Sequence, residues 1–248
     1  MFKRGWCSVL VVAGCAGVGQ GDVINLAAAK DNTLIEDAAG SLSNAKGSYF
    51  YSGRTASGLL RRGLLAFDFS AIPAGSTINS VQLTLHVSRA ASGSEVYGLH
   101  VMTGNWGEGT SNSDGSLGGG SGAAASTGDA TWTSAFKGGA AWATLGGDFN
   151  LVPSVTRSVV GTGSYAFTGT AMAADVQQWL SNPASNFGWA LLGNEADAST
   201  AKRFDSRENA TPSFRPSLVV TYTPVPSPAS AVVLLCGVSL TRRRRLGR

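Results

Sequence analysis

Residues 61–89 read RRGLLAFDFSAIPAGSTINSVQLTLHVSR, and this stretch decides the fold of the chain. It contains two segments, residues 65–69 and 81–87, in which large apolar side chains alternate with small or polar ones. Alternation with a period of two is typical of β-strands that have one buried face and one face in water. Between the two segments, residues 73–76 read PAGS and supply side chains typical of a turn. The stretch therefore predicts two consecutive strands against which the rest of the chain packs.

The remaining chain is predicted to form mostly short strands. One segment differs, because residues 170–180 place apolar side chains at helical spacing, with Thr170 as the expected N-cap and Pro183 just beyond the end. Further strands are predicted at residues 23–29, 95–102, 154–160, 164–168, 187–193, 201–208 and 216–223. We therefore expect an all-β, jelly-roll-like antiparallel β-sandwich with one short helix at about residues 171–181.

The charge of the chain is unevenly distributed. The formal net charge is +4, but seven of the 19 Lys and Arg residues lie in the terminal segments. The body, residues 22–223, keeps 12 of them against 15 Asp and Glu, a net charge of −3. A nucleic-acid partner needs a basic surface on the folded domain, so the composition argues against one.

Cysteines and histidines exclude several kinds of site. Cys7, Cys15 and Cys236 all lie in the terminal segments, so the body has no disulfide, no thiolate metal ligand and no cysteine nucleophile. His86 and His100 are the only histidines, which argues against a zinc site made of several histidines.

Residues 1–21 have the pattern of a signal peptide. A basic pair precedes an apolar run at residues 9–19, and small residues follow it. We expect export and cleavage by signal peptidase near residues 19–21. The sequence VAGC, which ends at Cys15, leaves open the alternative that Cys15 becomes a lipidated N-terminus.

Residues 224–248 form a second predicted address signal. A proline-rich spacer precedes an apolar segment, residues 229–240, which is short for a stable membrane span, and four consecutive arginines follow. The segment resembles the PEP-CTERM sorting signal, with Ser227 where that motif usually has Glu. The resemblance implies transient membrane anchoring, processing by an exosortase, and a place at the outer surface or in the extracellular matrix of a bacterium that produces exopolysaccharide.

Residues 30–37, KDNTLIED, are rich in oxygen ligands. Asp31, Asn32 and Glu36 offer the hard oxygen atoms that Ca²⁺ prefers, although the spacing of an EF-hand is absent. Structural calcium at these residues is the one cofactor that the sequence suggests. The alternative is a solvated turn in which the acidic and amide side chains accept hydrogen bonds from the backbone.

Two adjacent arginines begin the central stretch. Neighbouring residues of a strand face opposite sides, so either Arg61 or Arg62 must point toward the core or toward a sheet edge. A buried guanidinium needs a carboxylate or several carbonyls, and the candidate partners are Asp175 and Glu208. With Arg207, these residues form the set in which we expect structural ion pairs. The alternative is that both arginines reach water at a strand end.

Three tryptophans lie in or beside irregular segments. Trp106 opens a Gly- and Ser-rich stretch at residues 105–128, and Trp132 and Trp142 follow it. Exposed indole rings stack on sugar rings, so these residues are the candidate carbohydrate platform. The alternative is that all three pack in the interior, as large aromatic side chains usually do.

Two runs together resemble a known family. Residues 67–85, and the run from helix to strand at residues 175–192, are similar to the DNRLRE family of exported bacterial and archaeal domains, over about residues 31–223. The sequence DSRE at residues 205–208 is a loose match to the motif that names the family. The resemblance implies a jelly-roll-like β-sandwich of the kind appended to polysaccharide-active enzymes, and some members are classed as carbohydrate-binding modules.

These observations favour an exported, non-enzymatic surface or matrix protein that binds polysaccharide. One alternative is a structural or adhesive surface protein without a small ligand. The other is a polysaccharide lyase or hydrolase, for which Glu95, Glu108, Asp129 and Asp148 are the available acids, although none has a diagnostic spacing.

Overall fold

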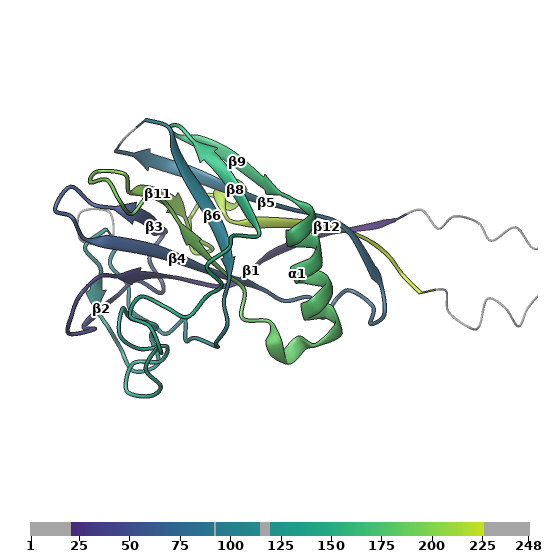
Figure 1. Ribbon diagram of the computed structural model, residues 1–248, viewed down its shortest axis with the longest axis horizontal. Helices are drawn as coiled ribbons and strands as arrows, with labels where there is room; N and C mark the ends of the chain where they lie inside the picture. The colour runs from purple at the N-terminus through teal and green to yellow at the C-terminus, as the bar shows by residue number, and fades with distance from the viewer. Residues whose placement is uncertain (1–20, 92, 115–119, 226–248) are drawn as a thin grey trace, which may run out of the picture.

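The computed structural model describes residues 21–91, 93–114 and 120–225 (Figure 1). The predicted signal peptide, apart from Gly21, and the apolar segment and arginines of the predicted sorting signal lie outside these residues. Among the described residues, no helix is both long and apolar enough to cross a membrane.

The chain forms an antiparallel β-sandwich with one α-helix, as the sequence predicts (Figure 1). One layer contains β12 (Ser217–Thr223), β5 (Thr77–Ala90), β9 (Gly163–Thr168) and β11 (Lys202–Asp205). The other contains β4 (Leu60–Phe67), β10 (Trp189–Leu192), β6 (Glu95–Val101) and β8 (Val155–Val159). Two strands, β1 (Asp22–Ile35) and β3 (Tyr49–Arg54), pair with strands of both layers. The remaining elements are β2 (Leu42–Ser43), β7 (Ala123–Ala124), α1 (Thr170–Ser181) and the 3-10 turns η2 (Pro183–Ser185) and η3 (Pro212–Phe214).

The central stretch forms β4 and β5, and the two strands differ in burial. In β5 the alternation holds, since Val81 and Leu83 are buried and Gln82 is exposed. In β4 both faces are buried, since Leu65 packs between the layers while Ala66, expected on the wet face, is 4% exposed. The prediction of one wet face is therefore right for β5 and wrong for β4.

Helix α1 packs its apolar face against the core between the layers. Met172, Val176 and Trp179 are buried there, as the helical spacing predicts. The N-cap is Gly169 rather than Thr170, and no side chain caps the helix. Packing of the apolar face, and not a capping hydrogen bond, thus stabilises this helix.

Most of the segment expected to be a turn or a calcium loop, residues 30–35, is part of a strand, whereas Asp37 accepts backbone hydrogen bonds from Ala39 and Ser41 in a turn. β1 continues to Ile35, pairs first with β12 and then with β4, and changes its register between Ala28 and Lys30. This irregularity lets one strand pass from one layer to the other. Asp31 and Asn32 are consequently buried in a sheet instead of lying in a solvated turn.

A second core lies on the outer side of β4 and β10, beneath the irregular segments after β6. It contains the tryptophans of those segments together with side chains of β1, β4 and β10: Leu34, Leu64, Ala66, Met102, Trp106, Ala130, Trp132, Ala135, Trp142 and Ala190. Trp106, at the start of the Gly-rich stretch, and the residues that follow this stretch are thus packed against the sandwich.

Candidate functional site

The three candidate sugar-stacking tryptophans are buried. Trp106, Trp132 and Trp142 are 1%, 7% and 6% exposed. Cations lie over two of the rings, since the Lys30 ammonium is 4.0 Å from the centroid of Trp106 and the Arg62 guanidinium carbon is 4.9 Å from that of Trp132. Stacking on a sugar needs an exposed ring face, so these residues do not form the expected platform.

The arginine pair makes two different kinds of contact. Arg62 forms a bidentate ion pair with Glu195, with both N–O distances 2.8 Å. Arg61 is 5% exposed and donates from Nε and Nη1 to backbone carbonyls. Neither arginine meets the partners expected from the sequence, because Asp175 accepts a hydrogen bond from the Trp189 indole and Glu208 lies in another cluster.

That cluster brings together the carboxylates of Asp31, Glu108 and Glu208. One oxygen from each lies within 4.8 Å of the others. Arg207 pairs with Glu208 at 2.8 Å and with Glu108 at 3.1 Å, so the expected pair of Arg207 and Glu208 is present. The Lys46 ammonium contacts Glu108 and lies 3.4 Å from Glu208. The side-chain cations of Lys46 and Arg207 thus already contact carboxylates of the cluster.

The cluster has one strongly perturbed group. Burial raises the pKa of Asp31 well above its usual value, and Glu208 and Glu108 add to the rise. The backbone N–H of Arg207, at 2.7 Å, and its guanidinium oppose it. A neutral Asp31 would leave two negative and two positive charges, which balance. Glu208 Oε2 is one of two buried side-chain oxygens in the described part of the chain that have no hydrogen-bond partner, and the other is Asn186 Oδ1.

The calcium set predicted from the sequence is only partly brought together. Asn32 uses its Oδ1 for the backbone N–H groups of Thr33 and Asn44, and Glu36 accepts a hydrogen bond from Leu60 N–H at 2.6 Å. Only Asp31 lies in the carboxylate cluster. The other two carboxylates of the cluster, Glu108 and Glu208, come from distant segments of the chain. The sequence did not indicate either of them as a calcium ligand.

The acids available for hydrolysis have structural partners. Asp129 is fully buried and accepts hydrogen bonds from three backbone N–H groups, two of which lie before β7 in the chain, and Asp148 accepts two. Glu95 accepts a hydrogen bond from Asn194, and Glu108 belongs to the carboxylate cluster. Asp148 lines a pocket of about 310 Å³, but no second acidic residue lines that pocket.

A groove of about 540 Å³ lies at the end of the sandwich where β3 turns into β4. Three arginines, one tyrosine and small or hydroxyl-bearing residues line it, and none of the lining residues is acidic: Tyr51, Thr55, Ala56, Ser57, Arg61, Arg89, Ala91, Gly120, Ser121, Ala201 and Arg203. We call it the arginine groove.

Strand pairing builds a row of side chains in the arginine groove. Arg203 of β11 lies directly opposite Tyr51 of β3 on one side and Arg89 of β5 on the other. Residues directly opposite each other in antiparallel strands project from the same face of the sheet. Arg61 enters from β4, which pairs with β3 at Gly53.

Neutral groups hold two of these guanidinium groups. Arg203 donates from Nε to Ser88 Oγ at 3.0 Å, and its guanidinium carbon lies 3.9 Å from the ring centroid of Tyr49. Arg61 donates to the carbonyls of Gly120 at 3.0 Å and Leu60 at 2.8 Å. Such contacts fix the arginines in place without an ion pair.

The arginine groove therefore concentrates positive charge. Among the described residues, no Asp or Glu oxygen lies within 4.0 Å of a guanidinium nitrogen of Arg61, Arg89 or Arg203. Burial lowers the pKa of Arg61, while the more distant Glu36 opposes that shift. An unpaired cation of low solvent exposure attracts an anion strongly.

Comparison of the chain with models of known families, and with curated proteins, finds no match.

Proposed function

We propose that this protein is an exported, non-enzymatic surface or matrix protein whose β-sandwich binds an anionic polysaccharide in the arginine groove. One observation carries the proposal: Arg61, Arg89 and Arg203 converge on a groove that no acidic residue lines, in a body whose net charge is negative.

The chemistry of the groove suits carboxylated or sulfated sugars. A guanidinium presents a planar set of donors that matches a carboxylate in bidentate fashion. Tyr51, and the hydroxyl-bearing side chains on the rim, suit the ring and hydroxyl groups of a sugar. Because the body as a whole is negative, a polyanion gains attraction only near the groove, and salt weakens that attraction.

The terminal segments support the location. The predicted signal peptide and the PEP-CTERM-like signal, whose characteristic residues lie outside the described part, lead us to place the domain outside the cell. The resemblance to the DNRLRE family points to polysaccharide as the ligand class. These inferences rest on the sequence alone.

Affinity electrophoresis of the full chain tests the proposal. In gels that contain polygalacturonate we expect retardation that falls as salt is added, and none in gels that contain neutral dextran. Arg89→Gln removes one charge from an exposed position of the groove, and we expect the affinity for polygalacturonate to fall about tenfold. Arg157→Gln on β8 is the matched control, because Arg157 is exposed and lies outside the groove, and its affinity should not change.

Other outcomes identify the alternatives. Equal losses in Arg89→Gln and Arg157→Gln would mean attraction by overall charge and would refute the groove. Release of reducing ends would establish an enzyme. Absence of retardation, together with self-association in sedimentation, would favour the adhesive alternative, for which the exposed side chains of Val96, Leu151 and Val152 near edge strand β8 are the supporting observation.

A further inference from the structure

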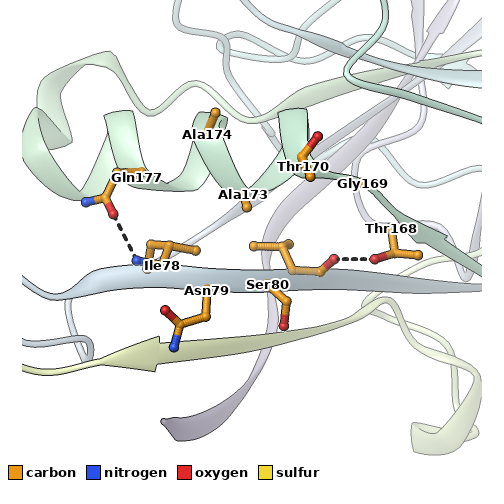
Figure 2. Close-up of a pocket in the computed structure, with 10 residues that line it drawn as sticks. Ile78, Asn79, Ser80, Thr168, Gly169, Thr170, Ala173, Ala174 and Gln177 are labelled. Carbon is orange, nitrogen blue, oxygen red and sulfur yellow. Dashed lines mark hydrogen bonds between the residues drawn. The ribbon is translucent and has the colours of Figure 1, made fainter. Parts of the chain in front are cut away.

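A second groove, of about 550 Å³, lies between α1 and β5 (Figure 2). We call it the edge groove. It is located at the first half of β5, whereas the arginine groove contains Arg89 near the end of that strand. Uncharged residues alone line it: Ile78, Asn79, Ser80, Val81, Thr168, Gly169, Thr170, Ala173, Ala174 and Gln177.

The edge groove exists because one edge of β5 lacks a neighbouring strand. β12 pairs with β5 along residues 77–84, whereas β9 begins to pair only at Gln82. After Thr168 the chain leaves the sheet and turns into α1. Before Gln82, therefore, no strand among the described residues covers the edge of β5 that faces the helix.

Two side chains bind the backbone at the two ends of this open edge (Figure 2). The amide of Gln177 accepts a hydrogen bond from Ile78 N–H at 2.9 Å and donates one to Ser76 C=O at 3.2 Å. The hydroxyl of Thr168 donates to Val81 C=O at 3.0 Å. A primary amide thus already occupies the place where a neighbouring strand would present a peptide group.

The space between these two contacts is short and partly apolar. Figure 2 shows Ala173 pointing from the helix toward β5, where Ile78 lies, and Val81 also lines the groove. The small side chain of Ala173 leaves room for a methyl group beside the strand. The gap itself spans only Asn79 and Ser80, because Gln177 and Thr168 close both ends.

We propose that the edge groove binds the acetamido group of an N-acetylated sugar. A secondary amide offers the donor and the acceptor that a β-strand edge pairs with, and its methyl group would pack against Ala173 and Ile78. The lining is uncharged, which suits a neutral group. An extended peptide would collide with Gln177 and Thr168, whereas a single amide fits between them.

This site is separate from the arginine groove, and it does not depend on the proposed function. The experiment titrates the full chain with N-acetylglucosamine, with glucose and with the peptide mimic N-acetylalanine methylamide, and follows binding by saturation-transfer NMR. We expect N-acetylglucosamine to bind at least about tenfold more tightly than glucose, since only the former supplies the amide.

Matched variants on one helix locate the binding. Ala173→Leu fills the groove and should weaken N-acetylglucosamine binding by about tenfold or more. Ala171→Leu, at an exposed position of α1 that does not line the groove, should leave the affinity for N-acetylglucosamine unchanged. In the unmodified chain a nuclear Overhauser contact should join the acetyl methyl to the Ala173 methyl, which tests the site without relying on the folding of a variant.

Three results would overturn the assignment. Equal affinity for glucose would show that the amide is not recognised. Tighter binding of the peptide mimic would make the groove a peptide site. If Arg89→Gln lost N-acetylglucosamine binding and Ala173→Leu kept it, the sugar would bind in the arginine groove instead. The proposed function would then still stand.

Discussion

At the scale of single residues, the cluster around Asp31 shows how buried charge is balanced. The Asp31 side chain is 1% exposed and lies beside Glu108 and Glu208, while Lys46 and Arg207 supply the opposite charge. Burial and the two neighbouring carboxylates raise the pKa of Asp31. In the sequence, Asp31 could be recognised as a candidate metal ligand, but neither its burial nor its neighbours could be, because Glu108 and Glu208 are distant in the chain.

The raised pKa of Asp31 predicts a definite dependence of stability on pH. An unfolded aspartate titrates near pH ~4, so between that pH and the higher pKa of the folded state the folded chain binds more protons. Its contribution to stability is fully present below about pH 4 and is lost as the pH rises through the folded pKa. Urea denaturation across this range should show the decline, and Asp31→Asn should flatten it. An equal slope in both proteins would contradict this account.

The same variant decides the calcium hypothesis. Lys46 and Arg207 already neutralise the cluster, so we expect millimolar Ca²⁺ to leave the melting temperature of the chain unchanged. A rise in melting temperature that Asp31→Asn abolishes would instead establish a calcium site built from Asp31, Glu108 and Glu208.

At the scale of elements, α1 completes an incomplete sheet. Its Gln177 side chain bonds to the backbone of β5 where β9 has not yet begun to pair. Helical spacing in the sequence was enough to predict the helix and its buried face. It could not predict this contact, because the position of Gln177 over Ile78 depends on how the helix is placed on the sheet.

Replacement of Gln177 by Leu should therefore destabilise the sandwich. Ile78 N–H and Ser76 C=O would lose their partners, which costs about 1–3 kcal/mol for a buried group left unpaired. Gln178→Leu, at the next and exposed position, is the control and should change the free energy of unfolding by less than about 0.5 kcal/mol. If chemical denaturation gave the same change in the free energy of unfolding for Gln177→Leu and Gln178→Leu, the contact of Gln177 with β5 would not contribute to stability.

The prediction of which strand faces are wet succeeded for β5 and failed for β4, where both faces are covered. Alternation identified β5, whose outer face stays polar. It misjudged Ala66 on β4 and ended β1 before Lys30, because the second core covers the outer side of these strands. That core comes from irregular segments, whose tryptophans show no periodicity from which packing could be predicted.

At the scale of the whole molecule, the two cores share walls. Leu65 of β4 faces the core between the layers, whereas its neighbour Leu64 faces the second core, and Leu191 and Ala190 of β10 are divided in the same way. Loss of either core would expose one face of β4 and β10, and the opposite faces of these strands form part of the other core. We therefore expect the described domain to unfold as one unit.

Two adjacent substitutions test this unity. Leu65→Ala and Leu64→Ala each remove a fully buried side chain, one from each core, and each should cost about 2–5 kcal/mol. Both variants should keep a single transition with an unchanged denaturant slope. If Leu64→Ala split the transition in two, the second core would be an independent folding unit.

Topology also explains why the arginine groove could not be predicted from the sequence. Arg61 and Arg89 lie at the two ends of the central stretch, on the consecutive strands β4 and β5, whereas Arg203 lies on β11, far away in the chain. Alternation could assign each to a face, and it singled out Arg61 as a residue in need of a partner. Only the placement of β11 between β5 and β3 brings them together with Tyr51.

The course of β1 separates the two ends of the described chain from the arginine groove. Asp22 pairs with Tyr222, so both ends of the described chain leave the sandwich side by side (Figure 1). At its other end Ile35 pairs with Arg61, in the arginine groove, after roughly 40 Å of extended strand. A domain held to a surface by either end would therefore act as a spacer. The arginine groove would then lie at the end of the domain far from the attached terminus, where surrounding polymers could reach it.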